Sequence, residues 1–167
     1  MATRGLVLLA KDTFTSVSSV QFDNVFSATY KQYKIIVNAL GSTTTTSLNF
    51  RLRVGGSDNS STNYQRQLIT GNNTTVSAAR LTSETSWVAF AGAVKSTEKN
   101  IVVCEVLNPF QTTYTSGTRS NQYETSGNIE LQVGAFGITV TTSYDGFTIL
   151  PGSGTITGTI TVYGLAE

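Results

Sequence analysis

The side chains that could do chemistry in this chain are carboxylates, hydroxyls and one thiol, because its 167 residues include no histidine and a single cysteine. Without histidine there is no Ser-His-Asp or Cys-His arrangement and no imidazole base or metal ligand. Cys104 cannot form a disulfide within the chain, and its apolar neighbours favour a small buried side chain over a reactive thiol. No phosphate-binding loop or dinucleotide fingerprint occurs. We therefore expect no metal ion and no cofactor.

Carboxylates are the remaining route to catalysis. A pair of them about 5–9.5 Å apart can hydrolyse glycosidic bonds, and Glu105 and Glu130 both fall in expected strands. Acids at the surface, solvated or paired with Lys or Arg, are the commoner case. The loop Gly55–Asn59 has too few carboxylates for calcium. A polysaccharide-degrading enzyme is thus a remote alternative, and we expect no enzyme and assign no catalytic residue.

Aromatic side chains near polar loops offer a different chemistry, the binding of sugars. A flat ring can stack on a sugar while nearby amides and hydroxyls form many weak hydrogen bonds. The candidate receptor or glycan contacts are Tyr64, Asn72, Asn73, Tyr114 and Tyr123. The alternative for each tyrosine is that its ring caps the end of the core.

The elements that would position these residues are short strands. Thr155–Tyr163 alternates threonines with Ile156, Ile160 and Val162, which predicts a half-buried strand. No stretch keeps a clear helical period, and the best helical candidate, Asn24–Lys34, is weak. The sequence therefore predicts an all-β fold, a single antiparallel β-sandwich domain of jelly-roll type over residues 1–167. Further strands are expected at 6–10, 17–22, 33–40, 48–54, 64–69, 76–81, 86–91, 100–107, 112–119, 129–136 and 144–150.

Charge is sparse, with 11 basic and 10 acidic residues and a net charge of +1. No run of Lys or Arg could neutralise a phosphate backbone, so we expect no nucleic-acid partner. The apolar run Leu6–Ala10 is shorter than the roughly 7–15 residues of a signal peptide and the roughly 20 of a membrane span. We expect synthesis in the cytoplasm and no membrane insertion.

One expected strand, Ile101–Leu107, is apolar on both faces. A strand in an isolated sandwich needs only one apolar face. The second face is covered either by a loop of the same chain or by another subunit. For the second case the candidate interface residues are Val102, Cys104 and Val106.

Three parts of the chain together resemble a known group of proteins. They are the start, MATRGLVL at 1–8; the passage with SSV at 18–20, FSATY at 26–30 and YKIIV at 33–37; and the end, with TSYDGFTI at 142–149, GTITG at 154–158 and ITVYG at 160–164. Over nearly its whole length the chain resembles small tailed-bacteriophage virion proteins of the minor tail or tail-fibre type. These motifs consist of strand and turn residues, and they carry no catalytic residue.

The resemblance implies a compact sandwich displayed on the virion as a homotrimer. The partners would be other virion proteins and host cell-surface glycan, and the protein would be made in the host cytoplasm. Unlike long fibres, the chain begins directly with the expected domain, which favours a short knob, a tail-tip subunit or a capsid-surface protein. The first hypothesis is a tail subunit with a host-adhesion role. The alternative is a capsid decoration protein, of the cement or head-fibre kind, present in far more copies per particle.

Overall fold

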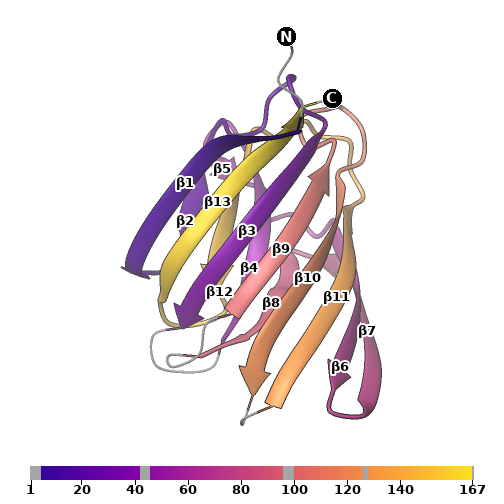
Figure 1. The fold of residues 1–167 in the computed structure, drawn as a ribbon. Helices are drawn as coiled ribbons and strands as arrows, with labels where there is room; N and C mark the ends of the chain where they lie inside the picture. The colour runs from indigo at the N-terminus through magenta and orange to yellow at the C-terminus, as the bar shows by residue number, and fades with distance from the viewer. Residues whose placement is uncertain (1–4, 42–45, 96–99, 126–127, 167) are drawn as a thin grey trace.

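The computed structural model describes residues 5–41, 46–95, 100–125 and 128–166. Within these ranges the chain forms thirteen strands joined by turns and bends, and no helix. Every strand pairing is antiparallel, and the two sheets lie face to face (Figure 1). The all-β fold with antiparallel sheets is therefore confirmed. None of the described segments is a helix long and apolar enough to cross a membrane.

The larger sheet has eight strands. In spatial order these are β1 (Gly5–Val17), β13 (Ile156–Ala166), β3 (Gln32–Gly41), β9 (Asn100–Leu107), β10 (Ser116–Thr125), β11 (Asn128–Ile138), β6 (Tyr64–Asn72) and β7 (Thr75–Glu84). The smaller sheet contains β2 (Val20–Phe22), β12 (Gly146–Pro151), β4 (Thr46–Val54) and β5 (Ser57–Asp58), and β8 (Trp87–Val94) pairs with the other edge of β4.

Most expected strands are confirmed, but the strand expected at 17–22 is interrupted at 18–19, between β1 and β2, and the strand expected at 112–119 is shifted. The weak helical candidate at 24–34 instead forms turns and bends and then enters β3 at Gln32. The strand expected at 112–119 begins only at Ser116 and runs to Thr125. The first four residues of the segment at 1–8 lie outside the described residues.

The core lies between the two sheets and is rich in aromatic rings. Phe50 of β4 stacks on Phe147 of β12 at 5.0 Å between ring centroids, and on Trp87 of β8 at 4.9 Å. The indole Nε1 of Trp87 donates a hydrogen bond to the Gly137 carbonyl oxygen of β11 at 2.9 Å. Trp87 thus links the smaller sheet to the larger one by both packing and a hydrogen bond.

The doubly apolar strand β9 turns toward the core the same face that was predicted to be a subunit interface. Val102, Cys104 and Val106 are fully buried, so they cannot contact another subunit. Burial raises the pKa of the Cys104 thiol, consistent with an inert side chain. The outward residues of β9 include Ile101 and Leu107, which are exposed.

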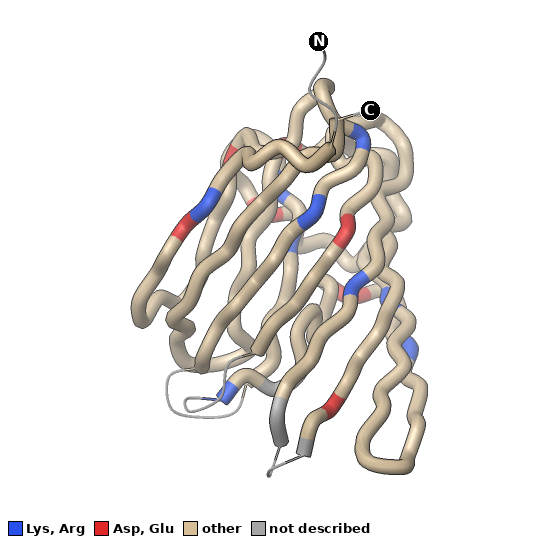
Figure 2. Tube along the Cα trace, in the orientation of Figure 1, with Lys and Arg blue, Asp and Glu red and all other residues tan. Residues whose placement is uncertain are grey.

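Charged residues are few and spread over both sheets and their loops (Figure 2). Threonine, serine, asparagine and glutamine supply most of the polar surface, as the composition predicts. The β6–β7 hairpin extends past the smaller sheet (Figure 1), and nearly all of β7 is exposed. The smaller sheet therefore covers one part of the inner side of the larger sheet and leaves the part formed by the β6–β7 hairpin open.

Candidate functional site: a polar cleft among the loops

A cleft of about 380 Å³ lies among the loops at the end of the sandwich where β4 finishes and β12 begins. Its size falls in the range of about 300–1,000 Å³ that is usual for ligand pockets. Loops carried on a rigid scaffold are the common location of binding sites. The lining residues are Val54, Ser57, Asp58, Asn59, Ser61, Asn63, Val140, Thr142 and Tyr144.

Arg53, at the end of β4, holds the loop that forms one wall. Arg53 is only 5% exposed, and its guanidinium donates a hydrogen bond from Nε to Asp23 Oδ1 at 2.7 Å. It also donates from Nη1 to Asp58 Oδ1 and to Thr148 Oγ1, and from Nη2 to the Gly56 carbonyl oxygen. Burial alone would lower the pKa of Arg53, but the hydrogen bonds to the two carboxylates outweigh it and raise the pKa. The guanidinium therefore stays charged and fixes the turn at residues 55–58.

Asn59 is the residue on which the cleft is organised. Its Nδ2 donates to the Tyr144 hydroxyl oxygen at 2.6 Å, and its Oδ1 accepts from the Ser61 backbone N–H at 3.0 Å. Its carbonyl oxygen accepts from the Tyr64 hydroxyl at 2.9 Å. Because the side chain and the backbone are both held, the loop wall keeps one shape.

Tyr64 was expected to contact glycan, and the structure corrects this expectation. Its ring is fully buried, and its hydroxyl oxygen also accepts the Leu52 backbone N–H at 3.0 Å. Burial raises the pKa of the hydroxyl well above its usual value. Tyr64 therefore positions Asn59 from below and cannot touch a ligand.

The chemistry of the cleft suits an uncharged, hydroxyl-rich ligand. Its walls carry hydroxyl and amide groups of Ser57, Ser61, Asn63 and Thr142, and valines supply the apolar surface. Asp58 contributes a carboxylate to the lining. Its Oδ1 accepts hydrogen bonds from Arg53 Nη1 and Thr148 Oγ1, so this oxygen is engaged within the protein. No cluster of metal-ligating side chains occurs among the described residues. The arrangement provides groups that can bind a ligand by hydrogen bonds.

The other expected contact residues do not gather at this cleft. Tyr114 is 63% exposed in the loop before β10, outside the cleft lining. Asn72 and Asn73 lie at the tip of the β6–β7 hairpin, and Tyr123 belongs to β10. The expected contacts thus fall into separate groups and not into one site.

Tyr123 is buried, so its expected role as an exposed contact is wrong. Its hydroxyl donates to Glu130 Oε2, and Asn72 Nδ2 donates to Glu130 Oε1. Burial first, and the hydrogen bond to Glu130 second, raise the pKa of the Tyr123 hydroxyl. Glu130 thus points to the inner side of the larger sheet, whereas Glu105, paired across from Thr118, points outward. The two acids lie on opposite faces and cannot flank one glycosidic bond.

Arg119 of β10 is another buried polar residue on the inner side of the larger sheet. Arg119 Nη2 donates to Gln132 Oε1 at 2.7 Å and to the Ala89 carbonyl oxygen at 3.0 Å. Its buried Nε and Nη1 have no hydrogen-bond partner among the described residues. Burial, and then the charge of Arg66, lower the pKa of Arg119 to about 10. Because this value lies below the usual one, keeping the charged form buried costs stability at neutral pH, and the cost shrinks as pH rises through 10.

We expect Arg119→Met to leave the fold intact and to raise the free energy of unfolding by about 1 kcal/mol at neutral pH, since apolar replacements of buried charges are often neutral or stabilising. Urea denaturation followed by far-UV circular dichroism measures the change. A loss of more than about 1 kcal/mol would show that the two existing hydrogen bonds outweigh the burial of the charge.

Sequence reasoning missed Asn59, Asn63 and Tyr144. The loop Gly55–Ser61 was recognisable by its glycines and polar residues, but its contact with Tyr144, 85 positions away from Asn59, leaves no local pattern. No protein-family model matches the chain, and neither the curated proteins nor the solved structures include a match.

Proposed function

We propose that the protein is a structural subunit of a bacteriophage particle, of the minor tail or tail-fibre type, and that its loop cleft contacts host cell-surface glycan. The observation that carries the adhesion role is the cleft itself, in which Asn59 is fixed by two buried tyrosines and surrounded by hydroxyls and amides. Such a preformed wall loses little conformational entropy when a ligand binds. The virion assignment is supported by the resemblance of the three sequence segments.

In this proposal the sandwich is of the jelly-roll type, assembles as a homotrimer and contacts other virion proteins. The protein acts by binding, without catalysis, metal ion or cofactor. A rigid sandwich with few charges suits this role, because such a surface can dock to a particle without strong non-specific attraction to nucleic acid or membrane.

Filling the cleft tests the adhesion role without disturbing the core. Ser61 lines the cleft and is exposed, so Ser61→Trp should block the space and leave folding unchanged. Phage particles carrying this variant are expected to adsorb to host cells at least about tenfold more slowly, with normal particle yield, a change equivalent to about 1.4 kcal/mol of binding.

The matched control is Thr29→Trp, an exposed position in the loop between β2 and β3 that lies outside the cleft lining. This control should adsorb normally. If Ser61→Trp particles adsorbed as fast as Thr29→Trp particles, the cleft would not be the surface that contacts the host.

A further inference from the structure

The outer face of the larger sheet carries an apolar surface that is left exposed by the described residues of a single copy. Six aliphatic side chains of β6, β7, β9 and β11 are between 41% and 74% exposed there. Together they leave on the order of 600 Å² open, at the upper end of what a monomeric protein usually exposes in one patch. We call this the outer apolar face; it consists of Ile69, Val76, Ile101, Ile129, Leu131 and Val133.

The β6–β7 hairpin makes this surface unusual. Nearly every residue of β7 is exposed, and in the part of the chain that the structure describes its outer edge has no neighbouring strand. Strand β7 is held through its pairing with β6, and long bare strand edges invite pairing with another chain. The hairpin would be stabilised if a partner covered it.

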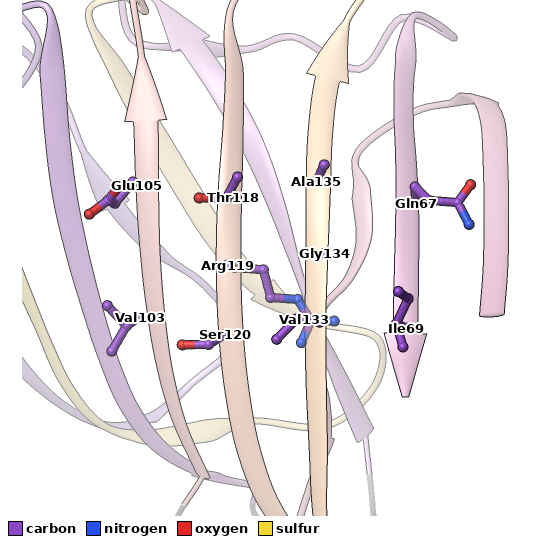
Figure 3. Close-up of a pocket in the computed structure, with 10 residues that line it drawn as sticks. All are labelled: Gln67, Ile69, Val103, Glu105, Thr118, Arg119, Ser120, Val133, Gly134 and Ala135. Atoms are coloured by element: carbon purple, nitrogen blue, oxygen red, sulfur yellow. The ribbon is translucent and has the colours of Figure 1, made fainter. Parts of the chain in front are cut away.

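A hollow of about 640 Å³ lies in the same face (Figure 3). It arises because Thr118, Ser120 and Ala135 have small side chains, whereas Val103 and Ile69 stand on either side. In Figure 3 the outward side chains of β9, β10 and β6 border this shallow depression. We call the low row of Thr118 and Ser120 on β10 the trough, and the side chains of Gln67 and Ile69 that border the hollow on β6 the ridge.

The ridge and the trough are arranged symmetrically about β11. Strands β6 and β7 lie on one side of β11, and β10 and β9 lie on the other. Cross-strand pairing places Ile69 and Ser120 opposite the same residue of β11, Val133. By the same pairing, Arg80 and Glu105 lie at the two ends of one row that passes through Ala135.

We propose that a second copy of this chain docks on the outer apolar face across a two-fold axis that runs along β11. A half-turn about that axis places Ile69 of one copy over Ser120 of the other, so the ridge fills the trough. It also brings Val76 over Ile101, and Arg80 over Glu105, an attractive pair of charges. Both contacts occur twice, as an isologous interface requires.

The size of the face favours a second copy as its occupant. A stable interface buries about 800 Å² on each partner, a little more than half of it apolar. The outer apolar face, with on the order of 600 Å² open, supplies the apolar share of such an interface. A half-turn is the rotation that sets one flat face against itself, so a three-fold assembly has to use other surfaces. The pairing goes beyond the proposed virion role and does not depend on it.

The test is the mass of the full-length protein in solution, measured by sedimentation equilibrium at micromolar concentration. The wild type is expected to be a hexamer, in which the pairing joins two of the proposed homotrimers, or a dimer if the three-fold contact does not form in solution. Ile69→Glu should weaken the pairing at least about hundredfold, because a charge would be buried in the trough. The matched control Leu8→Glu, at an exposed leucine of β1 outside the face, should leave the mass unchanged.

A monomeric or trimeric wild type, or an unchanged mass for Ile69→Glu, would overturn the proposal. Far-UV circular dichroism establishes that each variant is folded. The two proposals can fail separately. If the wild-type protein pairs in solution and phage particles that carry Ser61→Trp still adsorb normally, the pairing stands and the adhesion role is wrong.

Charge reversal tests the axis itself. Arg80→Glu would place two glutamates opposite each other and should weaken the pairing about tenfold. In a Glu105→Gln background the same Arg80→Glu change should have little effect, because the facing charge is gone. An equal loss in both backgrounds would contradict the contact between Arg80 and Glu105 and with it the two-fold arrangement.

Discussion

Replacing Trp87 with alanine is expected to lower the free energy of unfolding by about 4 kcal/mol. The indole is fully buried and packs on Phe50, on Tyr64 at 6.1 Å and on Phe136 at 5.4 Å between centroids. Alanine would leave a cavity between the sheets and would also leave the Gly137 carbonyl oxygen without its indole donor. Both losses fall at the place where β8 holds the two sheets together.

Urea denaturation followed by far-UV circular dichroism measures this loss, because the variant lacks the single tryptophan and its fluorescence. Trp87→Phe is the control: it keeps an aromatic ring but removes the N–H donor, and we expect a loss of about 2 kcal/mol. A loss below about 1 kcal/mol for Trp87→Ala would mean that the two sheets do not depend on this contact.

Replacing Arg53 with methionine is expected to lower the free energy of unfolding by about 3 kcal/mol and to abolish binding at the cleft. The side chain donates to Asp58, Thr148 and the Gly56 carbonyl oxygen, and these acceptors would lose their donor. Asp23 contributes less, because its side chain is 42% exposed and water screens the pair. Without Arg53 the turn at 55–58 is no longer anchored to β4.

Arg51→Met is the matched control for this variant. Arg51 lies two residues earlier in β4, and its closest carboxylate contact is Nη1 to Asp58 Oδ2 at 3.9 Å. We expect a loss of less than about 1 kcal/mol for this partly exposed pair. If both variants lost the same stability, the hydrogen bonds around Arg53 would not be what holds the loop.

The strands were predictable from the sequence where apolar and polar residues alternate. The strand Asn100–Leu107 was predicted with the bounds of β9, and the alternation at 155–163 placed Ile156, Ile160 and Val162 on the buried face of β13 as observed. Residues 112–115 were included in a strand because their types fit one, but they precede the hydrogen-bonded ladder of β10, which starts at Ser116. Residue types do not show where a ladder begins.

The candidate sites were harder to predict, for two physical reasons. When a strand is apolar on both sides, as β9 is, periodicity cannot show which side meets the core, and the side with Val102 was wrongly given to an interface. Tertiary contacts between distant segments also leave no local signal. The buried positions of Tyr64 and Tyr123, and the contact of Asn59 with Tyr144, depend on loops and strands that meet only after folding.

In our proposal this chain is a tail-associated subunit that presents its loop cleft to the host. Cryo-electron microscopy of the intact phage particle, with the chain located and its copies counted, tests it most directly. We predict density for this sandwich at the tail in a small number of copies, with the loops around Asn59 and Tyr144 directed away from the particle. Density repeated across the capsid surface would contradict this account and assign the protein to capsid decoration, and absence from the particle would contradict the virion role altogether.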